Sequence, residues 1–346
     1  MKIKLFKTEL RSIVSTLLLL VLVITQSFAQ RGYPSIGKVV RIEPEFDNLV
    51  PKDAKIEVLA TGFVWSEGPI WVKSGGFLLF SDVPTNTVHK WTQKEGVTTF
   101  LKPSGFTGLG FFSNEPGSNG LTINLSGELV SAEHGDRRIS AMPLSGQGKR
   151  TLADKFEGKK LNSPNDVVQH SSGAYYFTDP PYGLASQQDT DPLKEQNLNG
   201  VYRIGTDGSL KMVVSNLSRP NGLAFSHDEK LLYVAQSDQK APTITSYPVN
   251  SDGSLGEGKV FYDTKVLWAQ GLRGGPDGLK VDKKGNVWST GPGGVIVLSP
   301  EGKLLGRIET GEATANCAFG DDGSTLYLTA DFYLCRIKTS TIGAGF

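Results

Sequence analysis

Short apolar segments recur along the chain, and each follows a loop marked by Gly or Pro that usually ends in a polar residue. The six junctions read SEGPIW at Glu67, SNGLTI at Asn119, PNDVV at Asn165, PNGLAF at Asn221, PDGLKV at Asp277 and TANCAF at Ala315. Successive junctions are 52, 46, 56, 56 and 38 residues apart, which is the spacing of β-propeller blades rather than of helical repeats. The pattern predicts an all-β chain folded as a six-bladed β-propeller.

The residues between the junctions alternate between strand-like segments and turn signals. After Asn221, the segments NGLAF, LLYVAQSD and ITSYPV have strand character and are separated by SHDEK and by a Lys-Ala-Pro break. We therefore expect residues 55–340 to form a single propeller domain. In that domain, IEVLATG at 56–62 is expected to pair with the last blade and close the ring. Residues 30–54 are expected to form an N-terminal lead, loosely attached over 30–45.

The first 29 residues have the pattern of a secretory signal peptide. Four basic residues precede an apolar run over residues 13–24, and Ser27-Phe28-Ala29 matches a small-x-small cleavage site. The run is too short for a helix that spans about 30 Å of hydrocarbon. We expect cleavage after Ala29 and a periplasmic or secreted mature protein.

The charge of the chain gives no reason to expect a polyanionic partner. The whole chain carries a formal charge of +1, and removal of residues 1–29, with four basic residues and one acidic residue, leaves −2. A nearly neutral protein is not expected to bind nucleic acid or, after signal cleavage, a membrane. The oligomeric state is left open.

The two cysteines, Cys317 and Cys335, are expected on the first and third strands of the last blade. One intervening strand would separate them by about 9–10 Å, which is too far for a disulfide without distortion. Free thiols are therefore favoured over a disulfide bond.

Two loops are long enough to shape a pocket. Residues 185–199 interrupt the third blade after YYFTDPPYGL, and residues 105–117 are rich in glycine and carry Phe106, Phe111 and Phe112. Long loops in a compact domain are usually functional or mobile. Both loops are candidate walls of a pocket mouth.

The repeated polar position is a candidate metal site, because equivalent positions in radially arranged blades converge on the central axis. Glu67 and Asp277 supply two negative charges, and Asn165 and Asn221 supply amide oxygens, a set that suits a hard cation such as Ca²⁺. Mg²⁺, Mn²⁺ and Zn²⁺ are alternatives, although zinc is disfavoured by the lack of a His- or Cys-rich cluster in the sequence. The competing interpretation is that Pro-Asn-Gly and Pro-Asp-Gly are ordinary turns. Recurrence at one position, together with Glu67, favours one divalent cation.

Four sequence motifs resemble those of a known family. WSEGPIW, SPNDVV followed by YFTDPPYG, RPNGLAFS and GGPDGLKVDKKGN are similar to the signatures of the gluconolactonase/regucalcin family, over about residues 55–338. The resemblance implies a six-bladed propeller with one axial divalent metal, usually Ca²⁺, that hydrolyses sugar lactones or related cyclic esters. It implies that Glu67, Asn221 and Asp277 bind the metal, that Asn165 assists metal or substrate, and that Asp277 also transfers a proton.

The second blade adds further candidates. Asn119 is a candidate substrate ligand, and His134 in the variant sequence SAEHGDRRIS is a candidate for substrate binding and proton transfer. The alternative is that His134 is a surface-loop histidine bonded to a neighbouring carboxylate. Arg137 and Arg138 are expected to cap this loop and pair with acids. In TDPPYG, Tyr182 is a candidate substrate-binding pocket wall, and Asp179 is a candidate turn brace.

These features predict an exported, metal-dependent hydrolase that opens sugar lactones, with a small-molecule lactone as its partner. The cation would polarise the carbonyl, and either Asp277 or His134 would take a proton from the attacking water. Two alternatives stay open. The same site would suit other small esters or phosphotriesters if its mouth were wide and apolar. In the second alternative the ion only holds the blades of a non-enzymatic propeller together.

Overall fold

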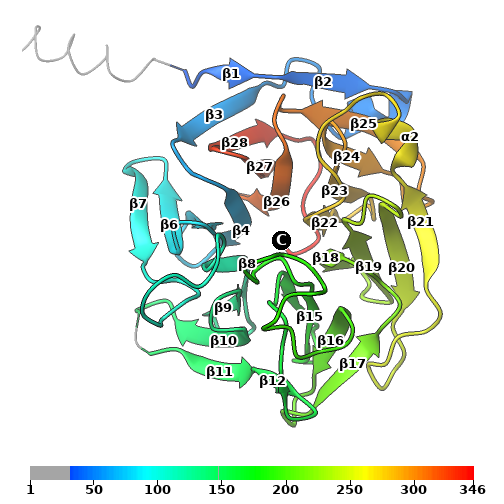
Figure 1. The fold of residues 1–346 in the computed structure, drawn as a ribbon. Helices are drawn as coiled ribbons and strands as arrows, with labels where there is room; N and C mark the ends of the chain where they lie inside the picture. The colour runs from blue at the N-terminus through cyan, green and yellow to red at the C-terminus, as the bar shows by residue number, and fades with distance from the viewer. Residues whose placement is uncertain (1–31, 147) are drawn as a thin grey trace, which may run out of the picture. The chain divides into compact units, whose positions relative to one another are not determined.

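The computed structural model describes residues 32–146 and 148–346, and Ser35–Phe346 form one compact unit. Six antiparallel sheets surround a common centre, and the innermost strand of each is the one that begins at or just after a sequence junction (Figure 1). The predicted six-bladed β-propeller is therefore confirmed. Helical structure in the described residues is limited to the 3-10 turn η1 (Pro44–Asn48) and the four-residue helix α2 (Lys265–Trp268). No described helix has the length and apolar character needed to cross a membrane. The predicted signal peptide lies outside the described residues.

Blades one to four each contain four strands taken consecutively from the chain. Blade one is formed by β4 to β7, at Ser66–Val72, Phe77–Asp82, Thr87–Thr92 and Gly96–Leu101. Blade two is formed by β8 to β11, at Ser118–Ile123, Glu128–Glu133, Arg138–Pro143 and Arg150–Ala153. A small hairpin of β12 and β13, at Lys155–Phe156 and Lys159–Lys160, follows. Blade three is formed by β14 to β17, at Val167–Gln169, Tyr175–Asp179, Gly200–Ile204 and Leu210–Val214. Blade four is formed by β18 to β21, at Pro220–Phe225, Leu231–Gln236, Thr243–Pro248 and Lys259–Asp263.

The last two blades each recruit N-terminal strands. Blade five contains β22 to β25, at Leu279–Val281, Val287–Gly291, Gly294–Leu298 and Leu304–Glu309, and gains β2 (Lys38–Arg41) on its outer edge. Blade six contains β26 to β28, at Thr314–Gly320, Thr325–Ala330 and Tyr333–Lys338, and gains β3 (Ile56–Thr61) and then β1 (Ser35–Ile36). The pairing of β3 with β28 closes the ring, as the sequence predicts.

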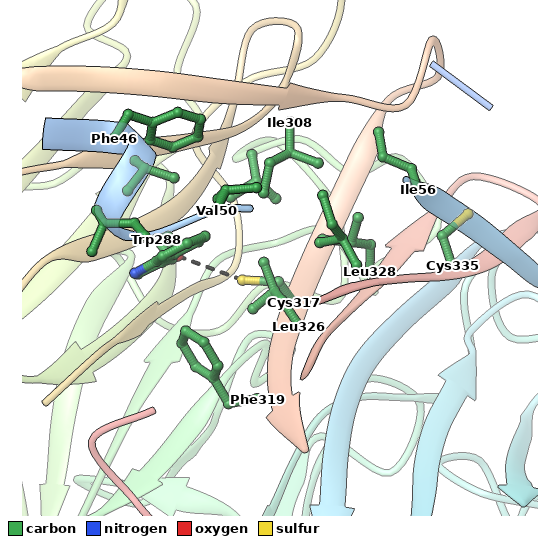
Figure 2. Packing of buried hydrophobic residues seen from close by; sticks show 14 of the residues in the cluster. Phe46, Val50, Ile56, Trp288, Ile308, Cys317, Phe319, Leu326, Leu328 and Cys335 are labelled. Atoms are coloured by element: carbon green, nitrogen blue, oxygen red, sulfur yellow. Dashed lines mark hydrogen bonds between the residues drawn. The ribbon is translucent and has the colours of Figure 1, made fainter. Parts of the chain in front are cut away.

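The N-terminal segment is more firmly attached than expected, so the prediction of a loose lead is wrong for the residues from Ser35 onward. Strand β2 pairs with β25 over its whole length. Phe46, Val50 and Ile56 are buried in a cluster with residues of blades five and six such as Trp288 and Leu328 (Figure 2). Burial of one such aliphatic or aromatic side chain contributes about 1.5–3 kcal/mol. The segment thus fills the space between the blades that it joins.

The two cysteines occupy the strands that the sequence predicts, and both are free and buried. Cys317 on β26 and Cys335 on β28 both pair in register with Leu328 on the strand between them. The Cys317 thiol donates a hydrogen bond of 3.5 Å to the carbonyl oxygen of Trp288 (Figure 2). Burial raises the pKa of both thiols to about 12, so neither has thiolate character near neutral pH.

Candidate active site at the propeller axis

A polar cavity of about 220 Å³ lies where the starts of the inner strands meet. Its lining residues are Trp65, Glu67, Glu115, Asn119, Asn165, Tyr182, Gln187, Asn221, Ser237 and Asp277. All four predicted metal ligands are in this set, and so are the predicted substrate residues Asn119 and Tyr182. The structure therefore brings together residues that are separated by up to about two hundred positions in the sequence.

Glycines after the repeated polar residues allow adjacent blades to approach this closely. A Cβ placed on Gly68, Gly120, Gly222 or Gly278 would lie well under 3.0 Å from an atom of Asn119, Asp166, Asp277 or Asn316, respectively, each of which belongs to the next blade. The Asn-Gly pairs at 119–120 and 221–222 lie inside strands β8 and β18, not in turns. The interpretation of Pro220-Asn221-Gly222 as an ordinary turn is therefore wrong, because its glycine serves a contact between blades.

Irregular strand pairing accompanies the repeated position. The register of the inner strand shifts between Glu67 and Ile70, between Ser118 and Leu121, and between Pro220 and Leu223. A β-bulge re-aims the side chains next to it and often lies beside an active site. The same local distortion thus recurs in the three blades that supply Glu67, Asn119 and Asn221 to the cavity.

The cavity gathers buried carboxyl groups whose ionisation is disfavoured by their surroundings. Burial, reinforced by Asp166 and Glu115, raises the pKa of Glu67 to about 8, although the Gly68 N–H donates a hydrogen bond of 3.0 Å to it. Burial, followed by the charges of Glu67, Asp166 and Glu115, raises the pKa of Asp277 well above its usual value. Among the described residues, none of the side chains that line the cavity is Lys, Arg or His. A bound cation would relieve the repulsion between these carboxylates.

The donor set fits a hard divalent cation. Asp277 Oδ1 is buried and has no hydrogen-bond partner in the described part of the chain. Asn221 Nδ2 donates to Ser237 Oγ at 2.7 Å, and Ser237 Oγ donates to the Pro276 carbonyl at 2.8 Å. The nitrogen of the Asn221 amide is thereby occupied, so its oxygen is the end available to a ligand. No group of three or more His, Cys, Asp or Glu side chains able to hold a metal occurs among the described residues.

His134 lies behind the cavity wall rather than on the surface or in the lining. Its side chain is completely buried, so the alternative of a surface-loop histidine is wrong. Its Nδ1 lies 3.1 Å from the carbonyl oxygen of Glu115, and its Nε2 lies 3.4 Å from Asn119 Nδ2. Because a carbonyl only accepts, Nδ1 carries the proton and Nε2 accepts from Asn119. Burial lowers the pKa of His134 to about 4, so the neutral ring holds the Asn119 amide with its oxygen free.

Three further residues named from the sequence have structural roles, whereas Tyr182 lines the cavity. Arg137 pairs with Glu195 at 3.5 Å, and Arg138 pairs with Glu133 at 2.7 Å, as predicted for loop-capping residues. Asp179 accepts backbone N–H bonds from residues 162 and 163 at 2.7 and 2.8 Å, as predicted for a turn brace. Tyr182 is a wall of the cavity, and burial raises the pKa of its hydroxyl to about 12.

Several residues of the site were not predicted from the sequence. The two long loops contribute Glu115 and Gln187 to the lining, so both are walls as expected, although these particular residues were not singled out. Trp65 and Ser237 complete the lining. In the sixth blade the residue that contacts Glu67 is Asn316, one position after the predicted junction residue Ala315. Asn316 Nδ2 donates a hydrogen bond of 3.4 Å to Glu67 Oε2. Phe106, Phe111 and Phe112 line a separate hollow.

The sequence and the fold of this chain are similar to those of known proteins. The chain belongs to the SMP-30/Gluconolactonase/LRE-like region family, which it matches over residues 65–331. It is 43% identical to a gluconolactonase of Zymomonas mobilis over 315 residues, 89% of this chain and 88% of that protein. The predicted family is therefore confirmed.

Two solved structures share the fold of this chain. A gluconolactonase from Xanthomonas campestris superposes with a TM-score of 0.76 at 30% identity, over 90% of this chain and 98% of that chain. A regucalcin from Agrobacterium tumefaciens, a calcium-binding protein, shares the fold with a TM-score of 0.63 at 21% identity, over 82% of this chain and 94% of that one. The relatives that carry the name gluconolactonase act in the predicted enzyme class, the hydrolysis of lactone ester bonds.

Proposed function

We propose that this protein is a metal-dependent hydrolase that opens sugar lactones, as its gluconolactonase relatives do. The observation that carries the proposal is the axial cavity, in which two buried carboxylates and several oriented amides converge. This arrangement combines a place for a cation with hydrogen-bonding groups for a polyhydroxylated ring. The 43% identity to a gluconolactonase over nearly the whole chain supports the same class of substrate.

The proposed metal ligands are Glu67, Asn165, Asn221 and Asp277. Ca²⁺ is the preferred ion, because the donors are all oxygens and are mixed between carboxylate and amide. A divalent cation bound here would polarise the lactone carbonyl and offset the negative charge that develops on its oxygen. The description of a regucalcin with this fold as a calcium-binding protein is consistent with that ion.

The remaining residues of the cavity would bind the lactone and move a proton. Asp277 is proposed as the base for the attacking water, because its carboxylate offers one oxygen for ligation and another for a proton. Asn119 and Asn165 are proposed to donate hydrogen bonds to lactone oxygens. Tyr182 is proposed to form the wall beside the lactone ring. His134 is proposed to act through Asn119, because its ring fixes the orientation of that amide.

The two alternative functions are less well supported. A site for phosphotriesters or bulkier esters would need a wide apolar mouth, but most of the cavity lining is polar and the three phenylalanines of the 105–117 loop lie outside it. A purely structural ion would need to be enclosed by its ligands. Instead the candidate ligands share the cavity with Asn119, Tyr182 and Gln187, which leaves room for a small molecule.

The N-terminal pattern supports a further proposal, that the protein is exported. Cleavage after Ala29 would release a mature chain into the periplasm or the medium. The lactone substrate would then be opened outside the cytoplasm.

Proton release tests the proposed function directly, because lactone opening produces an acid. The metal-stripped protein would be assayed in a pH-stat against aldonolactones, with Ca²⁺, Mg²⁺, Mn²⁺ or Zn²⁺ added back and the spontaneous rate subtracted. Hydrolysis restored by a divalent cation is the expected result. Full activity in the presence of a chelator would contradict the metal requirement, and inactivity on every lactone would contradict the enzyme class.

A further inference from the structure

Glu115 is a third carboxylate in the lining of the axial cavity. The 105–117 loop carries it there, alongside Glu67 and Asp277. It lies close enough for its charge to act on both of those carboxylates. The roles proposed above for metal ligation and proton transfer do not use it.

Glu115 is held from several sides. Gln187, from the other long loop, donates from Nε2 to Glu115 Oε1 at 3.1 Å. The Glu115 N–H donates to Ser113 Oγ at 3.3 Å, and the Glu115 carbonyl accepts from His134 Nδ1 at 3.1 Å. Two loops from neighbouring blades are thus joined at the cavity by one carboxylate.

The backbone at Gln187 supports a functional role for this contact. Gln187 has a φ of 56°, in the left-handed region that residues other than glycine rarely adopt. Such a conformation persists where the surroundings enforce it, and it is common at ligand-binding sites. Here it accompanies the placement of the Gln187 amide against Glu115, in the lining of the cavity.

The cavity lining holds three carboxyl groups, one more than a divalent cation balances. Such a cation balances the charges of Glu67 and Asp277, which leaves that of Glu115. The nearby basic residue Arg219 is paired with Asp189 at 2.7 Å, and no basic side chain lines the cavity among the described residues. An uncompensated charge in a confined, partly desolvated site repels a like charge strongly.

We propose that Glu115, held by Gln187, restricts the site to uncharged polyhydroxylated lactones and rejects lactones that carry an added phosphate or carboxylate. The Glu115 carboxylate accepts hydrogen bonds from ring hydroxyls, and the half-buried Trp65 offers an aromatic surface to the ring. This inference rests on the proposed lactone hydrolysis and adds the selection among lactones.

The test compares two substrates that differ only in one charged group, glucono-1,5-lactone and its 6-phosphate ester. The kcat/KM of the metal-loaded protein would be measured on both by proton release. Wild type is expected to prefer the neutral lactone by at least tenfold. Glu115→Gln, which keeps the shape and removes the charge, is expected to reduce that preference about tenfold, chiefly through a better kcat/KM on the phosphate ester. Glu257→Gln removes the same charge from an exposed position outside the cavity and is the matched control.

The outcomes separate this inference from the proposed function. Hydrolysis of the neutral lactone by wild type, with a preference that Glu115→Gln and Glu257→Gln leave equally unchanged, would overturn the role of Glu115 and leave the lactonase standing. A wild-type preference for the phosphate ester would do the same. A wild type inactive on both lactones would overturn the proposed function and this inference with it. Gln187→Ala is expected to raise KM for the neutral lactone, and an unchanged KM would count against the Gln187 contact.

Discussion

Gly222 packs directly against the backbone carbonyl of Asp277, so that a Cβ at position 222 would lie well under 3.0 Å from the Asp277 oxygen. Gly222 follows the candidate ligand Asn221 in blade four, and Asp277 is the candidate ligand of blade five. The contact therefore sets the separation of two ligand-bearing blades. A hydrogen atom in place of a side chain is what permits that separation.

Gly222→Ala is expected to separate blades four and five and displace Asp277. Forced overpacking against backbone typically costs about 1–3 kcal/mol, so the free energy of unfolding should fall by that amount and cation affinity should weaken. Urea denaturation and calorimetric titration with Ca²⁺ measure the two effects. Gly345→Ala is the control, because nothing lies within 4 Å of a Cβ there. Equal behaviour of the two variants would show that the blade contact does not position the site.

Glu67→Gln is expected to weaken the bound cation at least about tenfold, because it removes half of the proposed ligand charge and preserves the shape. Metal content after dialysis, by elemental analysis, and the affinity for added Ca²⁺ are the measurements. Glu95→Gln, in the exposed turn between β6 and β7 and outside the cavity lining, serves as the charge-matched control. Retention of stoichiometric metal at wild-type affinity by Glu67→Gln would rule out the proposed ligand set.

Export gives a prediction that is independent of the cavity. Cleavage at the proposed site would place Gln30 at the mature N-terminus, and intact-mass spectrometry of the periplasmic or secreted fraction would detect that species. Recovery of the chain from Met1 in the membrane fraction would contradict the proposed localisation.

Buried His134 should make stability depend on pH. Its pKa is about 4 in the folded protein and 6.5 for an ordinary histidine, so between those values the unfolded chain binds more protons than the folded one. The free energy of unfolding contributed by this residue therefore falls as the pH drops from about 6.5 to 4, by about 3 kcal/mol in all. The raised pKa of Glu67 has the opposite effect on stability, so the comparison must be made against a variant.

His134→Gln removes the titrating ring and isolates its contribution. The free energy of unfolding is measured by urea denaturation at each pH. Between pH 7 and pH 4 it should fall by about 3 kcal/mol more in wild type than in His134→Gln. Parallel pH profiles for the two proteins would show that the ring is not held neutral by burial.

The fold was predictable from the sequence because each blade repeats one junction, and a repeat of that period has few structural solutions. Strands β1 and β2 were not predictable in the same way. They contain two and four residues and belong to no repeat. Strand β2 pairs with β25, more than two hundred residues away in the sequence, and β1 pairs with the edge of β3. Their attachment depends on burial of Phe46 and Val50 between blades, which no local pattern reveals.

The site was predictable only where it follows the repeat. Glu67, Asn221 and Asp277 occupy equivalent blade positions, so convergence on the axis followed from the spacing. Glu115 and Gln187 come from irregular loops, whose course is set by contacts between the loops themselves. Asn316 was missed by one position, because the register of β26 shifts between Thr314 and Asn316, and a shift of one residue exchanges the faces of a strand.

Asp277→Asn is expected to abolish most of the activity even when enough cation is added to saturate the site. The amide keeps an oxygen for ligation and loses the basic site, so kcat should fall by about 10²–10⁴ while KM changes little. His134→Gln, assayed alongside, should raise KM and affect kcat less, because His134 contacts Asn119 rather than the lining carboxylates. An Asp277→Asn variant that still holds its metal and works within about threefold of wild type would remove Asp277 from proton transfer. A collapse of kcat in His134→Gln of the same size as that expected for Asp277→Asn would transfer the role to the second blade, and the buried ring would then have to reach the water through Asn119.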